Sequence, residues 1–315
     1  KIIPSLNMSD IIKGRSGVRA IALGSDGEII DDFKIARKYY YETLKSKTKN
    51  QIISFDGSFH GRTLGALAAG GPSKLEPFNT EISGFKFLDF GDLNKVKEAI
   101  SEDTAAILIE PLQGEGGVIE ASIEFIKGLR KLCDENNILL IFDEVQCGVG
   151  RTGKMFAHQW LDVVPDIMTV AKAIGNGFPL GACLTTEKVG LTMDFGSHGS
   201  TFGGNALTTA AGWASLKYIL DTDIPSECSH AGKYLKSLLD EMTTRHSNIV
   251  DIRGYGLLIG VEIAKNKAVD AMKLCLERGL LINAVRPNTI RLFPPLTVSE
   301  GEMNKAISIL EEVFD

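Results

Sequence analysis

The stretch that decides the fold of this chain is ILLIFDEVQCGVGRTGK at residues 138–154, together with IMTVAKAIGNGFP at residues 167–179. Each part begins with a short apolar run bounded by turn residues, which is typical of a buried strand in a parallel sheet. The first run ends in Asp143, and the second is followed by Lys172. Because open α/β sheets bind ligands just beyond the carboxyl ends of their strands, we expect this carboxylate and this amine to face the same crevice.

A lysine and a carboxylate at such a crevice suggest one particular cofactor chemistry. A lysine at the edge of an apolar pocket can lose its proton and attack a carbonyl to form a Schiff base. Pyridoxal phosphate carries such a carbonyl, and its pyridine nitrogen needs an acidic partner. Lys172 and Asp143 suit these two roles, although an arbitrary pair of this kind is more often a helix-capping Asp and a solvated Lys. The motifs around the pair favour the cofactor interpretation.

These motifs resemble those of the class III pyridoxal-phosphate aminotransferases, and within that family they are most similar to the acetylornithine enzymes. Several long motifs in the family's order are a specific signal, whereas a lone Ala-Lys dipeptide is not. The motifs cover nearly the whole chain: SFHGRT at 58–63, EPLQGEGG at 110–117, FDEVQCGVGRTGK at 142–154, AKAIGNGFPLGA at 171–182, HGSTFGGN at 198–205 and IRLFPPL at 290–296.

The resemblance implies a fold and a reaction. The fold is the type I pyridoxal-phosphate aminotransferase fold, with a large α/β domain at residues 33–222 and a small α+β domain at residues 1–32 and 223–315. The reaction is reversible, ping-pong amino transfer from N-acetylornithine to 2-oxoglutarate, a step of arginine biosynthesis. Ornithine, succinyl-diaminopimelate and 4-aminobutyrate are alternative amino donors. A non-catalytic, cofactor-free homologue is the alternative of another class, and a dinucleotide oxidoreductase is disfavoured because no GxGxxG follows a first strand.

The resemblance also assigns cofactor contacts. It gives Lys172 the covalent link to the cofactor and the transfer of the substrate's α-proton, and it gives Asp143 the contact with the pyridinium nitrogen. Phe59 is expected to stack on the cofactor ring, with core packing as the alternative. Gln146 is expected to bind the ring hydroxyl, with a solvated loop position as the alternative, while His60 suits a structural role equally well. The predicted cofactor contacts are Phe59, Asp143, Glu144, Val145, Gln146, Lys172 and Thr201.

Four residues are predicted to bind substrate, namely Arg62, Ser200, Glu115 and Arg291. Arg62 is suited to bidentate binding of a carboxylate, or else to a surface salt bridge. In the family, the arginine matching Arg291 binds the substrate's α-carboxylate and the glutamate matching Glu115 masks it; such a pair can equally be a structural ion pair. The threonine matching Thr201 reaches the cofactor phosphate of a neighbouring subunit, which implies a homodimer with shared active sites. A simple ST-turn is the alternative.

The resemblance breaks at Asp32–Phe33. There the family has a further stretch that ends in a glycine turn, whose backbone N–H groups at a helix N-terminus hold the cofactor phosphate. This sequence has no such turn, and we favour a missing segment over a true deletion. The conformational entropy lost when a glycine turn becomes ordered is compensated only by hydrogen bonds to a bound anion. We therefore predict a cofactor-free state with a spatial gap between Asp32 and Phe33, or within a residue or two of that bond.

The composition is that of an ordinary globular protein. The 315 residues are 44% hydrophobic and 23% charged, with a formal net charge of −6. This mild acidity argues against nucleic acid as a partner. The sequence contains no run of about 18 apolar residues, so it predicts no membrane span. Five scattered cysteines without a CxxC pair argue against a zinc site or a disulfide framework and favour a cytoplasmic location. We expect small-molecule substrates and no metal.

Strands and helices are expected to alternate, which predicts a mostly parallel sheet followed by a smaller α+β region. The expected strands lie at 51–55, 85–90, 105–110, 138–143, 167–170, 280–283 and 289–293, with a strand pair or one long bent strand at 250–263 and a hairpin at 18–31. The expected helices lie at 33–44, 92–100, 122–136, 204–220, 225–246, 267–278 and 299–314.

Overall fold

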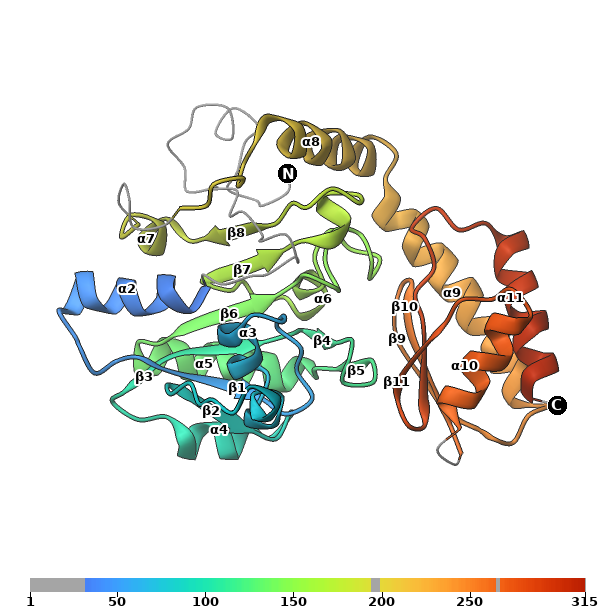
Figure 1. The fold of residues 1–315 in the computed structure, drawn as a ribbon, viewed down its shortest axis with the longest axis horizontal. Coiled ribbons are helices and arrows are strands. Elements are labelled where there is room, and N and C mark those ends of the chain that lie inside the picture. Colours follow the sequence, from blue (N-terminus) through green and yellow to red (C-terminus); the bar gives the residue numbers. More distant parts are fainter. Residues whose placement is uncertain (1–31, 194–198, 265–266, 315) are drawn as a thin grey trace. The chain divides into compact units, whose positions relative to one another are not determined.

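The described part of the chain forms two compact units. The computed structural model describes residues 32–193, 199–264 and 267–314 (Figure 1). Unit 1 consists of residues 32–111, 121–146 and 158–218, and unit 2 of residues 112–120, 147–157 and 219–314. The predicted domain boundaries stay a prediction. The expected hairpin at 18–31 lies outside the described residues.

Unit 1 is built on a six-stranded sheet in the order β2-β1-β3-β6-β7-β8. Every neighbouring pair is parallel except β7 with β8, so the sheet is mostly parallel, as predicted, with one antiparallel edge that was not predicted. Its central strands are buried along their whole length, as expected for strands covered on both faces. The strands are β1 (Gln51–Phe55), β2 (Phe85–Leu88), β3 (Thr104–Ile109), β6 (Leu139–Asp143), β7 (Ile167–Val170) and β8 (Ala182–Thr185).

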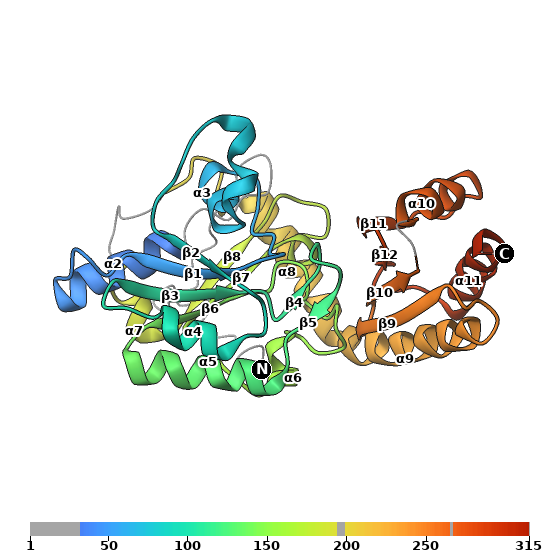
Figure 2. The ribbon, with the colours of Figure 1, turned by 90° about the horizontal axis from the view of Figure 1, so that it is seen from below.

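Helices cover both faces of this sheet (Figures 1 and 2). On one face, α4 and α5 pack their apolar residues against β1, β3 and β6. On the other face, α2 contributes Tyr39 and Tyr40 to a second core that includes Leu108 of β3. The helices are α2 (Asp32–Leu44), α3 (Leu64–Ala69), α4 (Leu93–Ala99), α5 (Ile123–Asn136), α6 (His158–Leu161), α7 (Glu187–Gly190) and α8 (Ala206–Asp221), with short 3₁₀ turns at Pro72–Lys74 (η1), Glu76–Phe78 (η2) and Lys172–Ile174 (η3).

Local signals in the sequence set several of these boundaries. The side chain of Asp92 accepts from the backbone N–H of Lys95 and begins α4, and Ser122 accepts from Phe125 and begins α5, both as predicted. Strand β2 was expected to reach residue 90, yet its pairing with β1 ends at Leu88, because β1 itself ends at the residue opposite.

The predicted gap is not found between Asp32 and Phe33, whereas a gap a residue or two earlier would lie outside the described residues, and the missing segment stays a prediction. Helix α2 runs without interruption from Asp32 to Leu44, so both residues lie in one helix. Ala36, Tyr39 and Tyr40 are buried at helical spacing, and each residue added to a packed helix gains a backbone hydrogen bond. The chain before Asp32 is outside the described residues.

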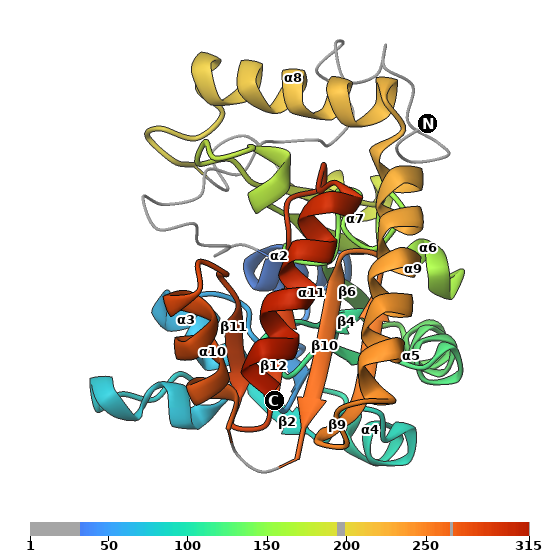
Figure 3. The ribbon, with the colours of Figure 1, turned by 90° about the vertical axis from the view of Figure 1, so that its right-hand side faces the viewer.

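Unit 2 is built on a four-stranded antiparallel sheet in the order β11-β12-β10-β9, with α9, α10 and α11 on one face (Figure 3). The expected element at 250–263 is a strand pair that turns at Gly256, where φ is +53°. The elements are β4 (Leu112–Gln113), β5 (Ile119–Glu120), α9 (Ile224–Thr243), β9 (Ile249–Tyr255), β10 (Leu258–Ile263), α10 (Ala268–Glu277), β11 (Asn283–Arg286), β12 (Thr289–Leu292) and α11 (Glu300–Phe314).

One strand of unit 2 was misplaced in the prediction. The strand expected at 280–283 occupies Asn283–Arg286 instead. Leu280 and Ile282 pack against the helices of the unit, and the strand starts where Asn283 pairs with Arg291 of β12. In the described residues, no helix combines the length and apolar character needed to cross a membrane.

Candidate active site

Strands β6 and β7 bring the predicted carboxylate and amine to the same end of the unit 1 sheet. The two strands are parallel neighbours, with Asp143 paired in register to Thr169. Lys172 follows the end of β7 by two residues and begins the 3₁₀ turn η3. The side chain of Asp143 is buried, whereas Lys172 is exposed. The two groups therefore follow adjacent strand ends, where parallel sheets place ligands.

The buried carboxylate of Asp143 is held by two hydrogen bonds. Nδ1 of His60 lies 2.8 Å from its Oδ2, and the backbone N–H of Val145 donates to its Oδ1 at 3.0 Å. An ionised carboxylate only accepts hydrogen bonds, so Nδ1 of His60 carries the proton in this contact. His60 is itself buried, and it lies in the loop after β1. The pair thus fixes the direction of the Asp143 carboxylate at the strand end.

The loop after β1 also positions Phe59. Its backbone N–H donates to Oε2 of Glu110 at 3.0 Å, and Glu110 is the buried residue that follows β3. The ring of Phe59 is half-buried and lies 5.6 Å from both the Arg62 guanidinium carbon and the Lys74 ammonium nitrogen. In the described part of the chain, Arg62 is exposed and takes part in no ion pair, so the salt-bridge alternative is not seen there. Two cationic groups therefore lie close to the ring of Phe59, next to His60 in the loop that contacts Asp143.

The backbone of the lysine segment is strained. Lys172 has φ +51°, a left-handed conformation that is uncommon for residues other than glycine. Helix α8 holds the segment, because Ser215 Oγ donates to the carbonyl of Ala173 at 3.2 Å. At Gly212 of the same helix, a Cβ would lie 2.2 Å from Leu180 Cδ2, so a larger residue there would have to displace the Leu180 side chain. Strain of about 1–3 kcal/mol at one residue persists where the surroundings enforce it, often at functional sites.

The remaining predicted cofactor residues of unit 1 have different surroundings. Glu144 is fully buried, and its carboxylate accepts from both the backbone N–H and Nδ1 of His158, at 2.8 and 3.0 Å, so it fixes the start of α6. Gln146 is half-buried directly after Val145. Ser200 and Thr201 are exposed, ahead of α8. Their predicted ligand contacts stay predictions.

Unit 2 carries the predicted pair of Glu115 and Arg291. Arg291 on β12 donates through an η-nitrogen to Oε1 of Glu115 at 2.7 Å, and their side chains are 10% and 39% exposed, respectively. Glu115 lies in the loop between β4 and β5. The ring of Phe293 lies under two guanidinium groups, 5.6 Å from that of Arg291 and 3.9 Å from that of Arg151. Burial lowers the pKa of Arg151 to about 10.

Comparison with known proteins identifies the family. The family model described as Aminotransferase class-III matches residues 11–314. The chain belongs to this family. The acetylornithine aminotransferase of Clostridium acetobutylicum is 46% identical over 302 residues, which are 94% of this chain and 75% of that protein. The acetylornithine aminotransferase of Methanocaldococcus jannaschii is 42% identical over 315 residues, 99% of this chain and 79% of that protein.

Solved structures of other aminotransferases share the fold. The ornithine aminotransferase from Toxoplasma gondii ME49 has a TM-score of 0.84 at 31% identity, covering 89% of this chain and 68% of that one. The N-acetylornithine aminotransferase from Stenotrophomonas maltophilia K279a has a TM-score of 0.76 at 33% identity, covering 89% and 70%. This class-III aminotransferase is thus a pyridoxal-phosphate-dependent transaminase, and the predicted type I fold is confirmed.

The residues of this aminotransferase fit the cofactor's ring and its reactive carbon. The buried carboxylate of Asp143, already oriented by His60, suits a pyridinium nitrogen, and the amine of Lys172 follows the adjacent strand end. The phosphate fits less well with the described residues. Helix α2 begins at Asp32, and the glycine turn that the resemblance implies for the phosphate does not stand before it in the sequence.

The structure adds site residues that the sequence left open or missed. His60 was equally compatible with a structural role, and its contact with Asp143 places it at the site. Glu110 gave a usable signal, because it is a polar residue directly after a buried strand, as Asp143 is at the end of β6. His158, which binds the Glu144 carboxylate, gave no signal in the sequence because the two meet only through folding.

Proposed function

We propose that this transaminase moves the amino group of N-acetylornithine to 2-oxoglutarate. The observation that carries the proposal is the Glu115–Arg291 pair, in which a half-exposed carboxylate covers a nearly buried guanidinium. A buried guanidinium needs an anion beside it, and either Glu115 or a substrate carboxylate can supply one. Relatives named acetylornithine aminotransferase, at 42–46% identity, support the same substrate.

The chemistry of the two substrates explains why Arg291 should bind a different anion in each half-reaction. Glutamate carries its reacting amine on the carbon next to the α-carboxylate, so Arg291 binds that carboxylate when glutamate or 2-oxoglutarate reacts. N-acetylornithine reacts through its terminal amine, far from its carboxylate, so Glu115 stays on Arg291 during that half-reaction. A carboxylate that is 39% exposed can turn toward water, whereas a guanidinium that is 10% exposed cannot.

The residues of unit 1 supply the reaction steps. Pyridoxal phosphate, when bound, supplies an electron sink for charge that develops at the substrate carbon. Asp143 would accept a hydrogen bond from the protonated ring nitrogen, and His60 holds the Asp143 carboxylate in its orientation. Lys172 would hold the cofactor through its amine, and the same amine would move the proton to and from the substrate carbon. Phe59 offers a ring face to the cofactor.

Further contacts complete the proposed site. Glu144, Val145 and Gln146 follow Asp143 in the chain and are proposed as further cofactor contacts. Arg62, exposed beside the Phe59 ring, is suited to a substrate's distal carboxylate, with Ser200 as a further substrate contact.

We also propose a homodimer in which Thr201 reaches the partner's cofactor. Large exposed apolar side chains follow Thr201 and continue along α8: Phe202 is 80% exposed, Leu207 66%, Trp213 47% and Tyr218 55%. Exposed apolar groups at this density are typical of a surface that another protein covers. The five cysteines are all free and buried, which favours a reducing compartment and hence the cytoplasm.

A donor screen tests the substrate assignment. The holoenzyme is assayed with 2-oxoglutarate and each of N-acetylornithine, ornithine, succinyl-diaminopimelate and 4-aminobutyrate, with Lys172→Ala as the blank. We expect kcat/KM to be highest for N-acetylornithine. A higher value for any other donor would reassign the substrate, and no turnover with any of the four would favour the non-catalytic alternative.

A further inference from the structure

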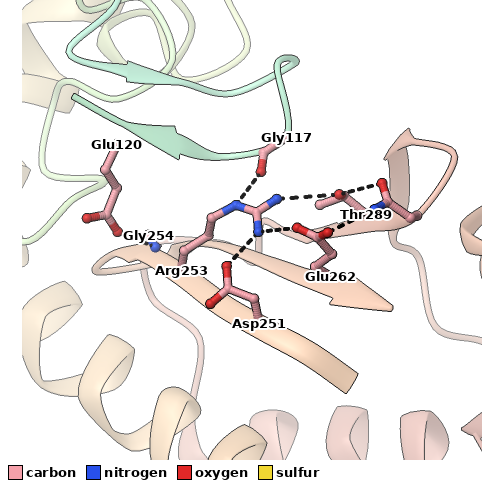
Figure 4. A network of polar contacts seen from close by, with 8 residues as sticks. Gly117, Glu120, Asp251, Arg253, Gly254, Glu262 and Thr289 are labelled. Atoms are coloured by element: carbon pink, nitrogen blue, oxygen red, sulfur yellow. Dashed lines mark hydrogen bonds and ion pairs between the residues drawn. The ribbon is translucent and has the colours of Figure 1, made fainter. Parts of the chain in front are cut away.

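Three consecutive residues of the loop that carries Glu115 are held by arginines from three different strands. We call residues 114–118 the Glu115 loop. Arg291 of β12 binds the Glu115 carboxylate, Arg286 of β11 donates through Nε to the carbonyl of Gly116 at 3.1 Å, and Arg253 of β9 donates through Nε to the carbonyl of Gly117 at 3.0 Å. Figure 4 shows the Arg253 contact from close by. The masking carboxylate therefore sits on a loop whose backbone is held directly after Glu115, at Gly116 and Gly117.

The sheet leaves room for the loop at one position. Arg253, Gly260 and Arg291 lie in one cross-strand row, because Gly260 of β10 pairs with both arginines. Residues paired in this way point to the same face of a sheet. A Cβ at Gly260 would lie 2.8 Å from the Cβ of Val118 and 3.2 Å from the carbonyl oxygen of Gly117. A glycine between the two arginines thus lets the loop lie against the sheet.

The loop itself is strained into this position. Val118 is fully buried, although its φ is +56°, a conformation that is an outlier for a β-branched residue. Such backbone persists only where the surroundings enforce it. After the loop, the carboxylate of Glu120 accepts from the backbone N–H of Gly254 at 2.5 Å and ties β5 to β9 (Figure 4). The loop is therefore held by contacts at residues 115–117 and just beyond its C-terminal end, at Glu120.

Arg253 pairs with two carboxylates, whereas Arg286 pairs with none among the described residues. Arg253 donates to the carboxylates of Asp251 and Glu262 at 2.6 and 2.7 Å, which leaves its Nε for the loop carbonyl (Figure 4). Burial acts to lower the pKa of Arg253, and these two hydrogen bonds outweigh it, so the pKa is raised. Among the described residues, Arg286 is exposed and pairs with no carboxylate; its contact there is the carbonyl of Gly116. Removing Arg286 should therefore break fewer other contacts than removing Arg253.

We propose that Arg253 and Arg286 are positioning residues that hold Glu115 over Arg291 and thereby set how readily the pair opens for an α-carboxylate. This inference rests on the proposed exchange of Glu115 for a substrate carboxylate. Loosening either anchor raises the fraction of molecules in which Glu115 has left Arg291. The enzyme then accepts glutamate better, relative to a donor that reacts through a terminal amine.

The test compares variants of the holoenzyme in two measurements. The variants are Arg286→Ala, Arg253→Lys, which keeps the cation for Asp251 and Glu262, and Glu115→Ala as the reference for an open pair. Arg245→Ala is the matched control, because Arg245 is an exposed arginine of unit 2 that pairs with Glu311 of α11. The first measurement is amide hydrogen exchange of the peptide that covers residues 112–120. The second is the ratio of kcat/KM for glutamate to that for the best terminal-amine donor.

Removing one hydrogen bond from a charged but exposed donor shifts such an equilibrium by about threefold to tenfold. We therefore expect Arg286→Ala to speed loop exchange, and to raise the glutamate ratio toward the Glu115→Ala value, by about that factor, while Arg245→Ala changes neither. If Arg253→Lys does not fold, Arg286→Ala alone decides. Unchanged loop exchange, or faster exchange with an unchanged glutamate ratio, would overturn the inference. An unchanged ratio in Glu115→Ala itself would instead refute the proposed exchange at Arg291, and with it this inference.

Discussion

Replacing Glu115 by alanine should separate its two roles, stabilising unit 2 and competing with substrate. Breaking a fully buried ion pair costs about 3–5 kcal/mol, and an exposed pair contributes about 0–1 kcal/mol. The Arg291 side chain is 10% exposed and that of Glu115 39%, so the pair lies between these limits. We expect Glu115→Ala to lower the free energy of unfolding by about 1–2 kcal/mol. In the wild type, 2-oxoglutarate must displace Glu115 from Arg291 and so loses the energy of this pair. Without Glu115 this cost is absent, so 2-oxoglutarate should bind about tenfold more tightly.

Two measurements check this expectation. Denaturant unfolding gives the loss of stability, and calorimetric titration of 2-oxoglutarate into the pyridoxamine form gives the affinity. The matched control is Glu311→Ala, which removes the partner of Arg245, a pair with side chains 52% and 32% exposed, and should cost less than about 0.5 kcal/mol without changing affinity. Equal affinity for 2-oxoglutarate in the wild type and in Glu115→Ala would show that the carboxylate does not compete for Arg291.

Five further substitutions test the site and the fold. Lys172→Ala should abolish the visible absorbance of the bound cofactor and nearly all turnover, and near-normal transamination would disprove its role. Asp143→Asn keeps the shape but removes the charge, so kcat should fall by about 10² or more while cofactor affinity changes less; an unchanged kcat would mean that another acid serves the ring nitrogen. Arg291→Ala should raise KM for 2-oxoglutarate more than KM for the acetylated donor, and equal increases would favour a purely structural pair. Gly232→Ala should cost about 2–3 kcal/mol in thermal unfolding, because its Cβ would lie 2.3 Å from a backbone oxygen in the β9–β10 turn, whereas Gly301→Ala meets open space and should be neutral or slightly stabilising.

The sequence alone determined most of the described elements and singled out the two residues at the centre of the proposed site. Apolar runs such as ILLIF before Asp143 are buried whatever their neighbours, and Ser122 and Asp92 set helix starts through contacts three residues away. The family motifs placed Asp143 and Lys172 after buried strands, and β6 and β7 are indeed parallel neighbours. These signals are local or carried by whole motifs, so they can be seen without the fold.

Tertiary structure decided everything that depends on pairing between distant segments. The strand predicted at 280–283 shifted because its register with β12 is set by a partner strand. Helix α2 takes its place from the packing of Tyr39 and Tyr40 against a core that includes Leu108 of a distant strand. His60 gained its place from a residue 83 positions away, and Gly116 and Gly117 gained their arginines from 170 and 136 positions away. A hydrogen bond over such separations depends on how the chain crosses the sheets, and no spacing in the sequence records it.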